Sequence, residues 1–141
     1  MRILQFASDS HPYSLRKARR RVHSALLRAG LSIEVARNME VAVGEALANV
    51  HQHAYDGGAG PVAVTVFRSD GGLTAVISDN GRATSTPSVP SVPPPSTDIR
   101  GRGLYMMGRL VDDVAISVNP WGHGLTVQMT VRIEGRSARA S

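Results

Sequence analysis

The sequence lacks cysteine altogether and has few aromatic side chains, which make up 4% of its 141 residues. Without cysteine the chain can form no disulfide bond, thiolate metal site or thiol nucleophile, as is typical of a reducing compartment. It also lacks the roughly 20 consecutive apolar residues of a membrane span and the apolar run of a signal peptide. We therefore expect a cytoplasmic protein that is not bound to a membrane.

Acidic residues are also scarce, with 11 against 16 basic ones and a net charge of +5. The basic residues gather in Arg16–Arg21 and in the C-terminal tail. Such a surface attracts acidic proteins, nucleotide phosphates or nucleic acid, although a solvated helix face is the plainer interpretation. Direct DNA binding is not expected, because no aromatic residues interleave the basic ones and no helix-turn-helix pattern is present.

The apolar residues, 42% of the chain, are enough for one core, so we expect a single domain over residues 1–134 and a disordered basic tail over 135–141. Pro12 with Ser14, and Ser32, are expected to begin the first two helices. The spacing of apolar residues predicts strands at about 3–8, 62–67, 73–77, 113–118 and 125–133 and helices at about 14–28, 33–54 and 103–110. This order predicts an α+β two-layer sandwich, with a mixed, mostly antiparallel sheet and the helices on one face.

Residues 82–100 lack the apolar spacing of a helix or strand and contain five of the eight prolines, with many serines and threonines. Proline removes backbone donors, and a polar run buries too little surface to fold by itself. The segment therefore predicts a mobile loop inside a compact domain, of the kind that often serves as a lid.

Within the second predicted helix, Glu45, Asn49, Gln52 and His53 fall on one polar stripe. A carboxylate and an amide one turn apart can hold a general base and a metal-bound oxygen at a phosphate site. The alternative is a solvent-exposed helix face whose polar residues have no further role.

Two glycine turns carry further chemistry. Asp79-Asn80-Gly81 ends an apolar strand, so its carboxylate emerges at the edge of the core, and Gly81 would let a planar ring approach the backbone. Gly101-Arg102-Gly103 directly precedes a helix, whose free N–H groups favour an anion. Neither turn matches the P-loop or the dinucleotide fingerprint, and each alone is also compatible with a plain turn.

Four segments, in this order, resemble the GHKL ATPase superfamily and, within it, the bacterial anti-sigma-factor serine kinases. They are VAVGEALANVHQHAY, DNG, GRGLYMMGRLVDDV and GLTVQM. The sequence departs from the superfamily pattern at Arg82-Ala83, where a second glycine is common, and at Leu125, where threonine is usual and Thr126 is the remaining hydroxyl.

The resemblance implies a role for each matching position. Asn49 would coordinate Mg²⁺, Glu45 would be the general base, and Asp79 would bind the adenine amino group. The implied ATP-binding residues are Asn49, His53, Asp79, Gly81, Gly101, Arg102, Gly103, Leu104 and Thr126, with residues 82–100 as the ATP lid.

The resemblance further implies an Mg-ATP-dependent serine kinase that sequesters a sigma factor and phosphorylates a serine of an antagonist protein. It also implies a homodimer. The alternative is a nucleotide-binding or degenerate module of the same fold, which captures a partner without phosphoryl transfer.

Overall fold

One antiparallel sheet forms the base of the computed structural model, which describes residues 1–95 and 102–133. The strands are β1 (Arg2–Asp9), β2 (Pro61–Ser69), β3 (Gly72–Asp79), β4 (Asp113–Val118) and β5 (Leu125–Arg132). They lie in the order β1-β2-β3-β5-β4, and each neighbouring pair is antiparallel. The predicted α+β sandwich is confirmed, with a sheet that is antiparallel in every described pairing.

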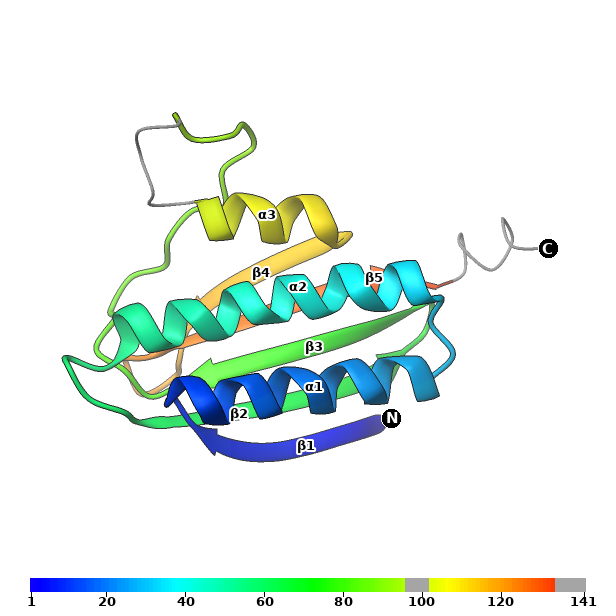
Figure 1. Cartoon of the computed structure of the whole chain (residues 1–141). Helices are drawn as coiled ribbons and strands as arrows, with labels where there is room; N and C mark the ends of the chain where they lie inside the picture. The colour runs from blue at the N-terminus through cyan, green and yellow to red at the C-terminus, as the bar shows by residue number, and fades with distance from the viewer. Residues whose placement is uncertain (96–101, 134–141) are drawn as a thin grey trace.

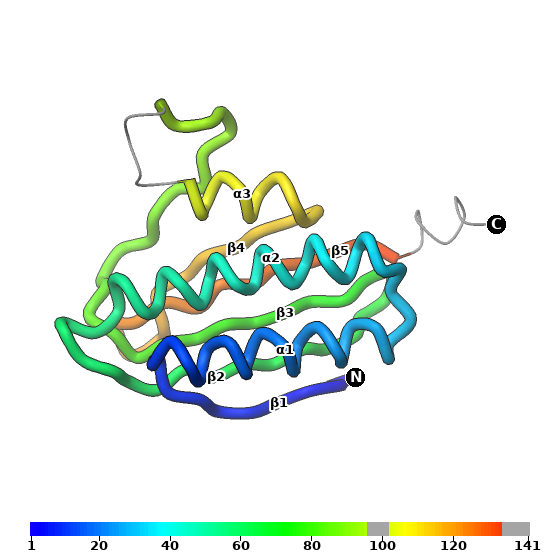
Figure 2. The backbone as a smooth tube through the Cα atoms, viewed as in Figure 1, coloured from blue at the N-terminus to red at the C-terminus, as the bar shows by residue number. Residues whose placement is uncertain are grey.

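Three α-helices lie side by side on one face of this sheet, with α2 in the middle (Figure 1). They are α1 (Pro12–Arg28), α2 (Ile33–Asn49) and α3 (Arg102–Leu110). Figure 2 shows the chain leaving the end of β3 and passing beyond the end of α2 before it reaches α3. Among the described residues, no helix is long and apolar enough to cross a bilayer.

The core lies between the helices and the sheet, because both carry an apolar face of the expected period. Val22 and Leu26 of α1 and Met39 of α2 are fully buried, as are Val64 of β2 and Ile77 of β3. The packing of α2 over the sheet therefore holds its polar side chains in a fixed place.

Helix α1 begins earlier than predicted. Its N-cap is His11, whose ring nitrogen accepts from the Tyr13 N–H, so the prediction of Ser14 as the cap was wrong. Proline has no N–H and a preset φ, which suits Pro12 to the first helical position. Ser32 caps α2 as predicted, accepting from the Val35 N–H at 3.2 Å.

The second helix does not stay α-helical to residue 54. After Asn49 it widens into a π-helical turn, η1 (Val50–Ala54), which ends at Tyr55. A π-turn changes which side chains share a face, and such turns often lie at functional sites. The polar stripe predicted for a regular helix is therefore divided at residue 50.

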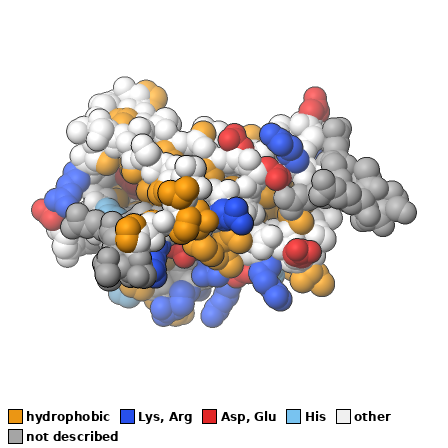
Figure 3. Space-filling view, turned by 90° about the horizontal axis from the view of Figure 1, so that it is seen from above, with side chains coloured by type: hydrophobic (Ala, Val, Ile, Leu, Met, Phe, Trp, Pro, Cys, Tyr) orange, Lys and Arg blue, Asp and Glu red, His pale blue; other side chains and the backbone are white. Residues whose placement is uncertain are grey.

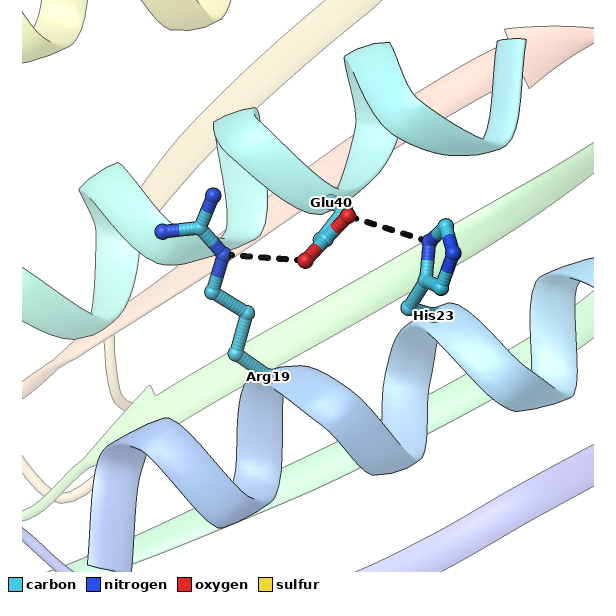
Figure 4. Close-up of polar contacts among 3 residues, drawn as sticks. All are labelled: Arg19, His23 and Glu40. Atoms are coloured by element: carbon cyan, nitrogen blue, oxygen red, sulfur yellow. Dashed lines mark ion pairs between the residues drawn. The ribbon is translucent and has the colours of Figure 1, made fainter. Parts of the chain in front are cut away.

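Helices α1 and α2 are joined by one shared carboxylate (Figure 4). Glu40 lies 3.4 Å from Arg19 Nε and 3.1 Å from His23 Nδ1. Both contacts are ion pairs by distance, and Arg19 is the firmer partner because its guanidinium is always charged, whereas His23 is charged only when protonated. Arg19 reaches Glu40 across Gly44, where a β-carbon would lie 2.7 Å from the guanidinium.

We predict that Glu40→Gln lowers the free energy of unfolding by about 1 kcal/mol, the upper range for a half-exposed ion pair. The measurement is urea unfolding followed by circular dichroism. Arg20→Gln, an exposed change on the neighbouring helix α1, is the control and should have little effect. Equal stability of the Glu40→Gln variant and the control would contradict the ion pair's contribution.

Candidate functional site

Two of the predicted motifs meet where α3 begins. Glu45 and Asn49 lie one turn apart on α2, and both are half-buried. A β-carbon at Gly103 would lie 2.8 Å from Glu45 Oε2 and 3.8 Å from Asn49 Oδ1. The absence of a side chain at residue 103 therefore lets α3 approach these two polar groups closely.

The first turn of α3 supplies backbone donors at this place. The first N–H groups of a helix have no partner within the helix, and its dipole makes that end positive. Arg102 is exposed there, whereas Leu104 packs against the core and anchors the helix. Gly101 lies outside the described residues. This end of α3 is chemically suited to an anion such as a phosphate.

The Glu45 carboxylate and the Asn49 amide are not held by other side chains. Within residues 1–95 and 102–133 neither side chain forms a hydrogen bond or ion pair, and the Asn49 side chain makes no cap bond to η1. Oxygen atoms with no protein partner are available to a ligand. The roles of Glu45 as general base and Asn49 as Mg²⁺ ligand remain predictions.

The Asp79-Asn80-Gly81 turn lies at the end of β3, beside η1. Asp79 is buried, and its Oδ1 accepts from the N–H groups of Gly81 (2.8 Å) and Leu125 (3.2 Å). No described residue donates to its Oδ2. Hydrogen bonds to Oδ1 thus fix the carboxylate, and Oδ2 is available to a ligand. The departure from threonine at Leu125 does not affect the bond, since a main-chain N–H makes it.

Glycine at residue 81 is required by the neighbouring helix rather than by its own φ. A β-carbon there would lie 2.4 Å from the main-chain oxygen of Ala54 in η1. The next residue, Arg82, donates its N–H to that same oxygen at 3.1 Å. The turn with Asp79 is therefore joined to the end of the helix that carries Glu45 and Asn49.

Tyr55 also holds the turn, through two hydrogen bonds of its hydroxyl group. Its hydroxyl accepts from the Asn80 N–H at 2.8 Å and donates to the main-chain oxygen of Pro61. Burial raises the pKa of the Tyr55 phenol, and the nearby Asp79 carboxylate acts in the same direction, while the Asn80 N–H opposes them. The phenol thus stays neutral and can donate and accept at once.

The loop between β4 and β5 also holds this turn, a role that the sequence did not indicate. Asn119 Nδ2 donates to the Asp79 main-chain oxygen at 2.7 Å, and His123 Nδ1 lies 2.8 Å from the Gly81 oxygen. Thr126 Oγ1 donates to Asn119 Oδ1 at 2.6 Å and lies 2.9 Å from Ser78 Oγ. Thr126, predicted to bind ATP, is therefore beside Asp79 with its hydroxyl engaged.

The predicted lid begins directly after the turn. Arg82 pairs with Asp56 at 3.0 Å on the surface, and the Gly124 N–H donates to the oxygen of Ala83. The described residues 84–95 contain no helix or strand, as predicted, and residues 96–100 lie outside the description. Half-buried Val89 lies over α3, because a β-carbon at Gly108 would be 3.0 Å from it. The beginning of the lid is thus close to the predicted site.

The polar residues that follow Asn49, namely His51, Gln52 and His53, are not grouped with Glu45 and Asn49. His51 and Gln52 line a cavity of about 580 Å³ together with Ser10, His11, Pro12, Tyr55 and residues 57–59. Glu45, Asn49 and His53 do not line it. His53 is exposed, and its role in nucleotide binding remains a prediction.

We predict that Gly81→Ala destabilises the fold by about 1–3 kcal/mol, because its methyl group would overlap rigid backbone at Ala54. Thermal unfolding of the purified protein measures this. The control is Gly58→Ala, where a β-carbon would meet nothing within 4 Å. Wild-type stability of Gly81→Ala would show that the turn does not pack on η1 as described.

Comparison with known proteins identifies the family. The model of the histidine kinase-like ATPase domain matches residues 9–131. Serine-protein kinases RsbW of Bacillus cereus and Bacillus anthracis are each 30% identical over 115 residues, or 76% of this chain and 70% of theirs.

Solved structures share the fold. The RsbU and RsbW domains of a Mycobacterium tuberculosis protein match with a TM-score of 0.67 and 21% identity, over 92% of this chain and 32% of that one. The histidine kinase domain of a blue-light activated histidine kinase from Erythrobacter litoralis matches with a TM-score of 0.58 and 19% identity, over 88% of this chain and 63% of that one. The chain thus spans about a third of the mycobacterial chain. It belongs to the histidine kinase-like ATPase family and, within that family, to the RsbW group of serine-protein kinases, as its four motifs predicted.

Proposed function

We propose that this chain binds ATP between α2, the Asp79-Asn80-Gly81 turn and the start of α3, and transfers the γ-phosphoryl group to a protein serine. The main support is the placement of Gly103 against Glu45 and Asn49, which joins a helix N-terminus to a carboxylate and an amide. Phosphoryl transfer needs mainly positioning and charge stabilisation, which this small set of groups supplies. As a member of a kinase group the chain uses ATP.

The oxygen of Asn49 fits a role in holding Mg²⁺. It is a hard, neutral donor with no protein partner within the described part of the chain, beside the helix end where phosphates would bind. No group of three or more His, Asp or Glu side chains able to hold a metal occurs among the described residues, so phosphates and water would complete the coordination. Bound Mg²⁺ would neutralise charge on the phosphates.

Glu45 fits the role of general base. The serine oxygen attacks the γ-phosphorus, the bond from the γ-phosphorus to the bridging oxygen breaks with its electron pair going to ADP, and the serine proton passes to the carboxylate. Glu45 Oε2, which lies beside Gly103 and accepts no hydrogen bond from a described residue, is available to take that proton.

Asp79 and Gly81 fit recognition of the base. Since Asp79 Oδ1 already accepts two N–H groups, Oδ2 is the oxygen that would accept from the adenine amino group. Main-chain donors at Arg102, Gly103 and Leu104, with Gly101 before them, would bind the phosphates. The described part of the lid, which begins at Arg82, would border the nucleotide.

For the protein partners we propose a sigma factor, which the chain would sequester, and an antagonist whose serine it would phosphorylate. The basic side of α1 suits an acidic surface of such a partner. Figure 3 shows several Lys and Arg side chains gathered along one edge of the molecule, and Arg16, Lys17, Arg20 and Arg21 of α1 are exposed. A sigma factor acts in the cytoplasm, where we propose that the chain works, as a homodimer.

We predict that Glu45→Gln lowers the rate of phosphoryl transfer by about 10²–10⁴-fold, because the general base is lost, and leaves ATP affinity within about threefold. The two measurements are phosphoserine formation on an antagonist encoded near its gene and calorimetric titration with ATP. Glu34→Gln, exposed in the first turn of α2, is the control. Asn49→Ala should remove the dependence of ATP affinity on Mg²⁺.

The two possible failures of this experiment have different meanings. If ATP binds but neither wild type nor variant transfers phosphate to any partner, the chain captures partners without chemistry. If the wild type binds no ATP, the proposed site is wrong.

We predict that the double variant Arg16→Glu, Arg20→Glu weakens partner binding by tenfold or more at low salt and reduces its salt dependence, since both charges are exposed on α1. Biolayer interferometry at several salt concentrations measures this. Arg109→Glu, a single charge reversal on α3, is the control. Equal affinity and salt dependence for the double variant and the wild type would exclude α1 as the docking surface.

A further inference from the structure

The loop between β4 and β5 contains a buried side-chain amide that has no role in the proposed function. Asn119 is only 4% exposed. Its Nδ2 donates to the main-chain oxygen of Asp79 at 2.7 Å, and its Oδ1 accepts from Thr126 Oγ1 at 2.6 Å, with Ser78 Oγ at a longer 3.5 Å. Since its donor and acceptor ends are both engaged, the amide has one orientation, and its loss would leave buried partners unsatisfied.

The loop itself is held rigidly around this side chain. The Asn119 N–H donates to the oxygen of Gly124 and the Gly122 N–H donates to the oxygen of Asn119, both at 2.9 Å. Gly124 has a φ of +81°, and a β-carbon there would lie 2.7 Å from both Asn119 Nδ2 and the Asp79 oxygen. The contact between Asn119 and Asp79 is therefore a fixed part of the fold rather than one of several loop arrangements.

This contact is one of three restraints that fix the direction of the Asp79 carboxylate. The main chain of Asp79 is held by Asn119, and its Oδ1 is held by the N–H groups of Gly81 and Leu125. With three restraints on one residue, Oδ2 has a defined direction before any ligand arrives. A preorganised acceptor of this kind discriminates strongly between a ligand with the matching donor and one without it.

We propose that Asn119 is a positioning residue for nucleobase recognition, which holds Asp79 so that its Oδ2 meets the exocyclic amino group of adenine. The inference rests on the proposed binding of adenine at Asp79. Asn119 does not touch the nucleotide, and it acts only through the main chain of Asp79. Its effect should therefore depend on whether the base carries the amino group.

The test compares ATP with purine riboside triphosphate, which lacks that amino group, by calorimetric titration of the full chain with Mg²⁺. Asn119→Asp keeps the shape and the acceptor for Thr126 but places an oxygen against the main-chain oxygen of Asp79. We expect the ratio of the two affinities to fall roughly tenfold, as for one lost hydrogen bond. A merely structural role would weaken both ligands alike and leave the ratio unchanged, which would overturn the proposal.

Asp79→Asn separates failure of this inference from failure of the proposed function. Because Oδ1 must still accept two N–H groups, the amide oxygen takes its place and an NH₂ group replaces Oδ2. This variant should abolish the preference for ATP. If it does not, adenine is not read at Asp79 and the proposed function is at fault. If it does, while Asn119→Asp keeps the wild-type ratio, only the role of Asn119 is refuted.

Three further variants keep the test decisive. The double variant Asn119→Asp, Asp79→Asn should show a ratio no lower than Asp79→Asn alone, because both changes act on one contact.

If Asn119→Asp does not fold, His123→Ala removes the neighbouring restraint on Gly81 from an exposed position and should lower the ratio by a few-fold. An unchanged ratio for His123→Ala would then count against the proposal. Ser117→Ala, exposed on β4, is the control and should match the wild type.

Discussion

The close approach of α3 to α2 at Gly103 is the contact on which the proposed site depends. It brings the N-terminal end of one helix to the polar face of another, so that backbone donors, a carboxylate and an amide share one small region. A side chain at residue 103 would have to displace either the Glu45 carboxylate or α3. The missing β-carbon therefore favours the close approach of two segments more than fifty residues apart.

The second half of the site is organised by a buried carboxylate. Asp79 emerges at the end of a central strand, where its Oδ1 accepts from two main-chain N–H groups and its main-chain oxygen accepts from the Asn119 side chain. Tyr55, directly after η1, and Asn119, in the β4–β5 loop, each form a hydrogen bond to the turn. This bracing keeps one carboxylate oxygen available to a ligand, which supports recognition of a specific base.

Much of this architecture could be predicted from sequence because it rests on local signals. The spacing of apolar residues predicted the two strands that form the hairpin of β2 and β3, and it also predicted α1 and α2. The order of the four motifs then indicated that distant polar residues would share a site. The placement of Gly103 against Glu45 agrees with that expectation.

Other features have no local signal. The π-turn at residue 50 differs from an α-helix by one residue in the hydrogen-bond step, which apolar spacing does not resolve. The bond from Asn119 to Asp79 joins residues forty apart, and Glu40 finds Arg19 and His23 only after two helices pack. His11 as the cap of α1 was missed because Ser14 is the commoner capping residue.

A structure of the chain with Mg²⁺ and a non-hydrolysable ATP analogue tests the central claim most directly. The account predicts adenine against Asp79 Oδ2 and Gly81, with the phosphates between Asn49 and the first turn of α3. An analogue bound elsewhere, for example in the cavity beside His51 and Gln52, would contradict it.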